Sequence, residues 1–237
     1  MNYQIFATAQ AAVEHIAAEF KRYSELGYPV HISLSGGSTP KLLFQTLAKA
    51  PYNTEIQWQN LHFWWGDERC VPPTDPESNY GEVQRLLFDH IAIPAANIHR
   101  IYGEETPEVA LTRFTADLKQ IQNVANNLPV FDWIILGMGT DGHTASLFPH
   151  HTNFIDPNLA VIAQHPESGQ YRISKTARLI ENAKRITYLV TGESKAKILK
   201  EIQSTAAEQL PYPAAKIVSK QGATEWYLDQ QAAALLR

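Results

Sequence analysis

The sequence predicts an α/β fold in which a mainly parallel sheet is flanked by helices. Apolar, strand-like segments alternate along the chain with segments whose apolar residues recur at helical spacing, which is typical of βαβ units. Three of the strand candidates end in a glycine-bearing turn, the place where such sheets bind their ligands. No linker-like stretch or internal repeat divides the 237 residues, so we expect a single domain over residues 1–237.

The chain begins with a helix, a strand and a second helix. Apolar residues recur at helical spacing over residues 10–26, and Gly27 follows them, as glycine commonly does at the end of a helix. A strand is expected over residues 28–35, where a glycine turn ends it. The next helix is expected over residues 41–48, because Pro40 suits a first helical turn, where its missing N–H costs nothing.

The same alternation continues to the end of the chain. Apolar segments predict further strands at residues 61–65, 130–136, 160–163, 185–190, 217–218 and 225–228. Helices are expected at residues 80–90, 111–124, 193–203 and 229–236, and a long polar loop at residues 66–79. Because the carboxyl ends of parallel strands meet at one edge of a sheet, the glycine turns that follow them should converge on one pocket.

Composition excludes several classes of protein. Hydrophobic residues make up 44% of the chain and charged residues 19%, which is too apolar for a disordered protein. The net charge of −4 argues against nucleic acid as a partner. The sequence has no signal-peptide pattern at its start and no apolar run of about 18 residues, so we expect a cytoplasmic protein with no membrane partner.

The histidines and the single cysteine carry no metal-site pattern. One cysteine, Cys70, excludes a disulfide framework and a multi-cysteine metal site. Neither a His-Glu-x-x-His pattern nor the Gly-x-Ser-x-Gly segment of serine hydrolases occurs. No histidine near Cys70 in the sequence would activate it, so we expect this residue to fill space rather than to act as a nucleophile. We expect no metal.

The first glycine turn, Ser35-Gly-Gly-Ser-Thr-Pro40, has the features of an anion site. Gly36 and Gly37 let a ligand approach the backbone, Ser38 and Thr39 offer hydroxyls, and the following helix presents free N–H groups at the positive end of its dipole. These features suit a phosphate, although no Gly-Lys-Ser/Thr of a P-loop follows. The alternative is an ordinary turn between a strand and a helix, with Ser or Thr as the cap.

Charged residues elsewhere are candidate ligands of the same anion. Asp67 and Arg69 follow the strand at 61–65 in the segment Trp-Gly-Asp-Glu-Arg, and Arg69 could pair with its acidic neighbours or hold an anion with its planar guanidinium. Arg172 and Lys195 could be solvated surface charges. They could also complete a phosphate site, because an acidic protein that binds an anion needs such local help.

The third glycine turn contains the candidate base. Residues 137–142 match Gly-x-Gly-x-x-Gly formally, but Asp156 comes too early to serve as the acid of a dinucleotide site. His143 follows Gly139 and Asp141 in this turn, before a helix expected to start at Thr144. A histidine at a helix N-terminus is kept neutral by the dipole and can accept a proton. Alternatively, His143 only hydrogen-bonds the turn, and Asp141 either orients the ring or shapes the turn.

Taken together, these segments resemble the 6-phosphogluconolactonase family, within the larger glucosamine-6-phosphate isomerase/deaminase group. The resemblance extends over nearly the whole chain. It rests on Ser35-Gly-Gly-Ser-Thr-Pro40, Trp65-Gly-Asp-Glu-Arg69, Ser78-Asn-Tyr80, Leu136-Gly-Met-Gly-Thr-Asp-Gly-His-Thr-Ala-Ser-Leu-Phe-Pro149, Arg172, Gly192-x-x-Lys195-Ala, Leu210-Pro, Trp226 and Asp229.

The resemblance implies a single Rossmann-like domain that hydrolyses 6-phospho-D-glucono-1,5-lactone to 6-phosphogluconate in the oxidative pentose phosphate pathway. It implies His143 as the base, which takes a proton from water and returns it to the ring oxygen as that oxygen leaves. Backbone N–H groups of the glycine turns or Arg69 could hold the oxyanion. We expect a monomer that needs no cofactor, with a sugar phosphate as its only partner. The implied phosphate and substrate contacts are Gly36, Gly37, Ser38, Thr39, Asp67, Arg69, Gly139, Arg172 and Lys195.

Two alternatives remain open. The sister activity, isomerisation with deamination of an amino-sugar phosphate, needs carboxylates, and that group carries an Ala-Phe-Asn-Glu-Pro-type segment after the Asp-Gly-His turn. Here Ala145-Ser-Leu-Phe-Pro149 contains no glutamate, and Arg69 stands where the sister group has tyrosine. The second alternative, a non-catalytic sugar-phosphate sensor, would need an output domain, for which one fold of 237 residues leaves no room.

Overall fold

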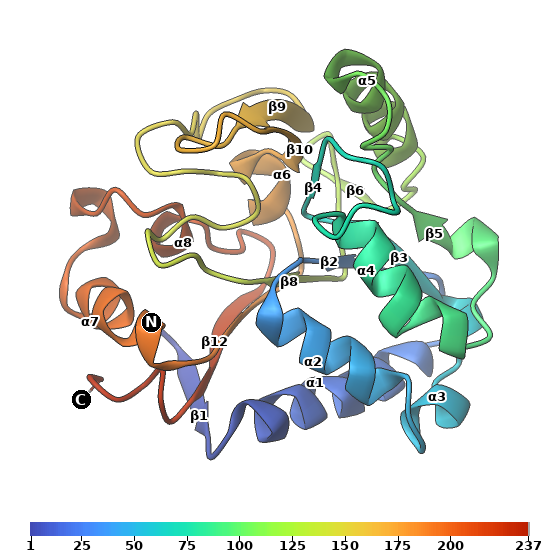
Figure 1. Ribbon diagram of the computed structural model, residues 1–237, viewed down its shortest axis with the longest axis horizontal. Coiled ribbons are helices and arrows are strands. Elements are labelled where there is room, and N and C mark those ends of the chain that lie inside the picture. The colour runs from blue at the N-terminus through green and yellow to red at the C-terminus, as the bar shows by residue number, and fades with distance from the viewer. Residues whose placement is uncertain (237) are drawn as a thin grey trace.

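A parallel sheet of seven strands forms the centre of the molecule, which is described for residues 1–236 by a computed structural model (Figure 1). The strand order is β1-β12-β11-β8-β2-β3-β5, and each neighbouring pair is parallel. The strands are β1 (Tyr3–Phe6), β2 (Val30–Leu34), β3 (Leu61–Trp65), β5 (Ile98–His99), β8 (Trp133–Leu136), β11 (Arg185–Val190) and β12 (Ala223–Asp229). The predicted class, a mainly parallel sheet flanked by helices, is confirmed.

Helices flank this sheet, and the longer ones bury an apolar stripe of their surface. The helices are α1 (Ala9–Ser24), α2 (Ser38–Leu47), α3 (Tyr52–Glu55), α4 (Asn79–Leu86), α5 (Pro107–Leu118), α6 (Ala177–Glu181), α7 (Ala196–Ser204) and α8 (Pro213–Lys216). Short 3-10 turns are η1 (Trp58–Asn60), η2 (Phe88–His90), η3 (Ala95–Asn97), η4 (Glu193–Lys195) and η5 (Ala207–Gln209). Helices α1 and α2 lie side by side, and Phe20 of α1 contacts Trp133 of the sheet at 5.2 Å between ring centres (Figure 1).

A second, antiparallel sheet lies beyond the carboxyl ends of the central strands (Figure 1). It consists of β4 (Asp67–Arg69), β10 (Tyr171–Lys175) and β9 (Ala160–Gln164), and a separate hairpin is formed by β6 (Val124–Ala125) and β7 (Leu128–Pro129). The sequence predicts a loop where β4 lies, because three residues of mixed charge carry no strand pattern. Gly66 joins β3 to β4, so the second sheet grows directly out of the first.

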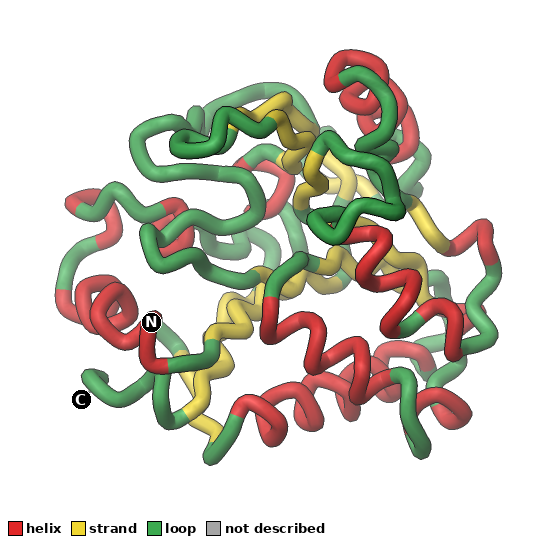
Figure 2. The backbone as a smooth tube through the Cα atoms, in the orientation of Figure 1, coloured by secondary structure: helices red, strands yellow, loops and turns green. Residues whose placement is uncertain are grey.

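Several predicted elements are wrong. Residues 144–147 form a tight turn, with hydrogen bonds in both directions between Thr144 and Leu147 and a φ of 48° at Ala145, instead of the start of a helix. Residues 217–218 are not a strand, and the helix predicted over 229–236 is absent: Asp229 ends a strand, and residues 230–235 form successive turns. Helix α5 begins at Pro107, four residues before the predicted start, and ends six residues before the predicted end at 124. Residues 137–159 contain no helix and no named strand (Figure 2).

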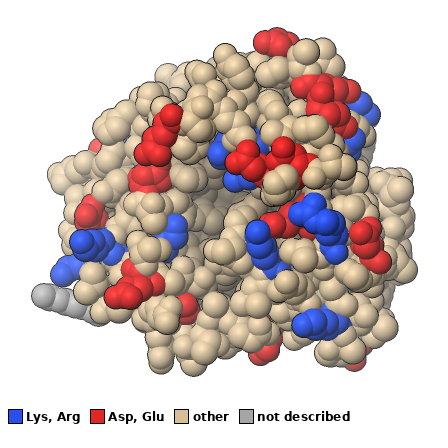
Figure 3. All heavy atoms as spheres, in the orientation of Figure 1, with Lys and Arg blue, Asp and Glu red and all other residues tan. Residues whose placement is uncertain are grey.

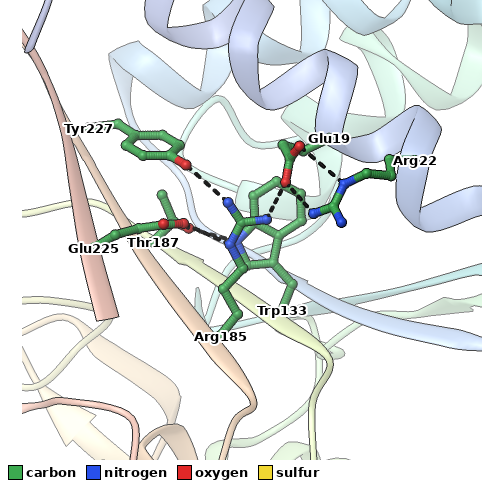
Figure 4. Close-up of polar contacts among 7 residues, drawn as sticks. All are labelled: Glu19, Arg22, Trp133, Arg185, Thr187, Glu225 and Tyr227. Carbon is green, nitrogen blue, oxygen red and sulfur yellow. Dashed lines mark hydrogen bonds and ion pairs between the residues drawn. The ribbon is translucent and has the colours of Figure 1, made fainter. Parts of the chain in front are cut away.

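An ion-pair network surrounds Arg185 at the amino end of β11 (Figure 4). Arg185, the first residue of β11, donates hydrogen bonds to Glu19 of α1 at 2.7 Å, to Glu225 of β12 at 2.6 Å and to the Tyr227 hydroxyl at 3.0 Å. Its guanidinium also lies 4.6 Å from the centre of the Trp133 ring. These contacts join α1 to β11 and β12 near the amino ends of the strands, whereas the glycine turns lie at the carboxyl ends.

Candidate active site

A cavity of about 200 Å³ opens at the carboxyl ends of β2, β3, β8 and β11. A hollow is visible on the face shown in Figure 3, with Lys and Arg side chains around it. All three glycine turns reach the cavity, as predicted. Of the residues predicted for the site, those that line it are Gly36, Gly37, Ser38, Thr39, Asp67, Arg69, Gly139, His143, Arg172 and Lys195.

The first turn brings an open helix N-terminus to the cavity. Helix α2 begins directly after Gly37, whose φ of 118° favours glycine, and no side chain caps its first N–H groups. Gly36 is needed because a Cβ there would lie 1.9 Å from Oδ1 of Asn79. The Thr39 and Thr191 hydroxyls are 2.6 Å apart, which links α2 to the end of β11. Uncapped N–H groups and a helix dipole attract an anion to this point.

The second turn supplies a buried carboxylate and a guanidinium with free donors. Asp67 accepts a hydrogen bond from the Ser146 hydroxyl at 2.5 Å, and its main-chain oxygen accepts one from the Asn79 amide at 2.9 Å. Arg69 donates from Nη1 to the Glu77 carbonyl, while its buried Nε has no partner among the described residues. A buried guanidinium nitrogen with an unused N–H favours an additional acceptor, such as a ligand oxygen.

The third turn holds His143 against Asp141. Nδ1 of His143 lies 2.6 Å from Oδ1 of Asp141, which also accepts the main-chain N–H of His143 at 3.2 Å. The main-chain N–H of Gly139 donates to the His143 carbonyl, and a Cβ at Gly139 would lie 2.2 Å from Nδ1. Burial acts to raise the pKa of Asp141, but the hydrogen bond and charge of His143 lower it to about 2. Asp141 itself does not line the cavity, but it contacts His143, which does.

The predicted reason for a neutral His143 was wrong, because no helix begins at residue 144 and no helix dipole acts on the ring. In place of a helix N-terminus, the Asp141 carboxylate lies 2.6 Å from Nδ1 of the ring. A carboxylate that accepts from Nδ1 fixes the tautomer with Nε2 unprotonated, which is the state in which an imidazole accepts a proton. The Phe148 ring packs against the imidazole of His143, with 5.1 Å between the ring centres.

Arg172 and Lys195 reach the cavity from different elements. Arg172 lies opposite Arg69 in the pairing of β10 with β4, and Lys195 ends η4, just after β11. Burial lowers the pKa of both side chains, while the carboxylates of Asp67 and Asp141 respectively act in the opposite direction. Partly buried cations gain from binding an anion, so these residues and Arg69 form a basic lining in an acidic protein.

Several residues at the site were not predicted from the sequence, among them Asn79, Thr191 and Ser146. Asn79 lines the cavity as the first residue of α4, Thr191 follows β11, and Ser146 holds Asp67. Asn79 had a signal, since it lies in the motif Ser78-Asn-Tyr80. Cys70 is half-buried against the core and is not part of the cavity lining, in line with a packing role.

The structure offers no metal centre among the residues it describes, since no group of three or more His, Cys, Asp or Glu side chains is placed to hold an ion. Over the same residues, no helix has the length and apolar character needed to cross a membrane.

The fold and this site together define a class: α/β proteins with a cavity lined by glycine turns and basic side chains at the carboxyl edge of a parallel sheet, next to a histidine–carboxylate pair. The chain matches the model of the family "Glucosamine-6-phosphate isomerases/6-phosphogluconolactonase" over residues 5–226, and it belongs to that family.

Individual relatives agree with this assignment. The chain is 72% identical to the 6-phosphogluconolactonase of Haemophilus influenzae, over the full length of both proteins. Its structure is similar to the crystal structure of the devB protein, with a TM-score of 0.98, 59% identity and coverage of 100% of this chain and 99% of the other. A monomeric glucosamine-6-phosphate deaminase, 20% identical, shares the fold with a TM-score of 0.82 over 99% of this chain and 100% of the other.

Proposed function

We propose that this chain is a 6-phosphogluconolactonase, which hydrolyses 6-phospho-D-glucono-1,5-lactone to 6-phospho-D-gluconate with His143 as the general base. The observation that carries the proposal is the His143–Asp141 pair, with 2.6 Å between Nδ1 and Oδ1, at the edge of a cavity lined by Arg69, Arg172 and Lys195. The full-length identity of 72% to a protein named for this activity supports it.

The chemistry needs one base and no covalent intermediate, because a lactone is an activated ester that water can attack. Nε2 of His143 takes a proton from the water as its oxygen bonds to C1. Asp141, ionised above a pKa of about 2, stabilises the imidazolium that forms. The C1–O bond to the ring oxygen then breaks, and the imidazolium returns the proton to that oxygen. General acid–base help of this kind contributes ~10²–10⁴-fold.

The remaining cavity residues have two tasks in this proposal. Gly37, Ser38 and Thr39 at the start of α2, with Arg69, Arg172 and Lys195, hold the phosphate and so orient C1 toward His143. The oxyanion of the tetrahedral intermediate needs N–H donors, which the glycine turns and Arg69 bring to the cavity. Gly36 and Gly139 allow the close approach of backbone and side chains that both tasks require.

Deamination of an amino-sugar phosphate is the competing activity within the family, and the shared fold does not separate the two. Moving a proton between carbons needs carboxylates at the substrate. Among the described lining residues the only carboxylate is Asp67, and it is already hydrogen-bonded by Ser146. The site therefore favours lactone hydrolysis.

The test is a direct comparison of substrates. The purified chain is given freshly prepared phosphogluconolactone or glucosamine 6-phosphate in parallel, and the spontaneous hydrolysis of the lactone is subtracted. We expect consumption of the lactone alone. Consumption of the amino sugar, or a lactone rate equal to the uncatalysed one, would contradict the proposal.

A further inference from the structure

We propose that Glu68 is a positioning residue, which holds Arg69 and Asn79 in place at the cavity. Its carboxylate accepts four hydrogen bonds from two different elements. Oε1 accepts the main-chain N–H groups of Arg69 and Asn79, both at 2.8 Å, and Oε2 accepts the Tyr80 N–H at 2.7 Å and the Ser78 hydroxyl at 3.1 Å.

Because Glu68 is buried, its carboxylate depends on these hydrogen bonds for stabilisation. The residue is only 1% exposed, and no ion pair with Lys or Arg is found for it among the described residues. A buried carboxylate without a cationic partner is tolerated only when its oxygens are fully hydrogen-bonded. Here the donors are main-chain groups at the start of α4, whose dipole adds to the stabilisation. The carboxylate therefore fastens the first turn of α4 to β4.

The two elements joined in this way carry one wall of the cavity. Asp67 and Arg69 flank Glu68 on β4, and Asn79 begins α4. Asn79 in turn packs against Gly36, so the position of α4 also defines the space beside the first glycine turn. His143 comes from a different strand end, after β8. Glu68 should thus affect how substrate is held and not the chemical step, an inference that rests on the proposed phosphate role of Arg69.

Glu68→Gln tests the proposal, because the amide leaves two of the four donors without an acceptor. We expect KM for the phosphorylated lactone to rise about 10-fold or more while kcat stays within about 3-fold. The affinity for inorganic phosphate should weaken in parallel, and the amides of Asn79 and Tyr80 should exchange hydrogen faster. Glu181→Gln is the matched control: this buried glutamate of α6 is bound by Lys220, away from the cavity, and its variant should keep both constants.

The possible results separate the role of Glu68 from the proposed function. An unchanged KM and phosphate affinity in folded Glu68→Gln, or a fall in kcat alone, overturns the positioning role. If Glu68→Gln does not fold, Glu68→Asp keeps the carboxyl group but withdraws its oxygens by one methylene, and its KM should rise in the same way. A wild-type chain that does not hydrolyse the lactone overturns the proposed function instead, and the role of Glu68 is then decided by phosphate affinity and amide exchange.

Discussion

At the residue scale, the proposed chemical step depends on the pair formed by His143 and Asp141. His143→Ala removes the base, and we expect kcat to fall by ~10²–10⁴-fold with little change in KM. Asp141→Asn leaves the ring in place but no longer fixes its tautomer, so kcat should also fall, by about 10-fold or more. The measurement is the initial rate of lactone hydrolysis, corrected for the spontaneous reaction. An undiminished rate in His143→Ala would remove this residue from the mechanism.

The cations of the cavity should act on binding. Arg69→Ala and Lys195→Ala each remove charge-assisted contacts to the phosphate, and KM for the phosphorylated lactone should rise about 10- to 100-fold. KM for unphosphorylated gluconolactone should change far less, because it lacks the group that these residues hold. Lys220→Ala, at an exposed lysine paired with Glu181, is the control and should change neither constant. Equal effects on both lactones would place Arg69 and Lys195 outside the phosphate site.

At the element scale, the register of three adjacent strands places three histidines together. His31 of β2 pairs with His62 of β3, whose Nδ1 lies 3.0 Å from Nε2 of His99 on β5. Burial, followed by the proximity of His62, lowers the pKa of both His31 and His99 to about 4. Neutral histidines in the folded state bind fewer protons than in the unfolded chain. Stability is thus fully present above about pH 6.5 and is lost as the pH falls through about 4.

Replacing His99 tests this cluster. Phenylalanine keeps the stacking on Trp64, whose ring centre lies 4.0 Å away, but it does not titrate. The drop in Tm between pH 7 and pH 5 should therefore be smaller in His99→Phe than in the wild type, by about 2–4 °C. The exposed His90 offers the same substitution as a control and should leave the drop unchanged. A drop of wild-type size in His99→Phe would show that its charge does not limit acid stability.

The elements also show where sequence reasoning succeeds. Strands β3 and β8 were predictable because their apolar residues are buried on both faces, as in a parallel sheet. Strand β4 was not, since its three charged residues are held by partners distant in the sequence, such as β10 and α4. The segment 144–147 was expected to begin a helix, but it forms a turn. There Ser146 donates hydrogen bonds from its hydroxyl to Asp67 and from its main-chain N–H to Ser174.

At the scale of the whole molecule, the sequence predicts the fold class and the edge of the sheet at which the glycine turns meet. The short turns after predicted strands contain Gly36, Gly37 and Gly139, so these residues could be recognised from the local sequence. The topology of a parallel sheet brings such turns to its carboxyl edge. The hydrogen-bond partners of Asp67 and Glu68 could not be predicted from the sequence, because they come from α4 and from residue 146. In the proposed function, an acidic chain with a net charge of −4 binds an anion through a few cations placed at one edge of the sheet.

We expect the amino end of the central sheet to contribute stability and its carboxyl end to carry the site. Replacing Arg185 tests this separation. The Arg185 side chain is 13% exposed and pairs with Glu19 and Glu225, so Arg185→Met leaves Glu225 partly buried without a cation and Glu19 paired with Arg22 alone. We expect the free energy of unfolding to fall by about 2–4 kcal/mol. Because the network lies at the amino ends of the strands, kcat and KM should stay within about 2-fold at temperatures where the variant is folded.

The matched control for Arg185 uses the same carboxylate. Arg22 also pairs with Glu19, at 2.6 Å, but its side chain is 63% exposed, so water already screens this ion pair. Arg22→Met should therefore cost only about 0–1 kcal/mol. Urea denaturation followed by circular dichroism gives both values, and the lactone assay gives kcat and KM for the same samples. Equal losses in the two variants, or a kcat that falls in Arg185→Met well below its unfolding transition, would mean that the two ends of the sheet are coupled.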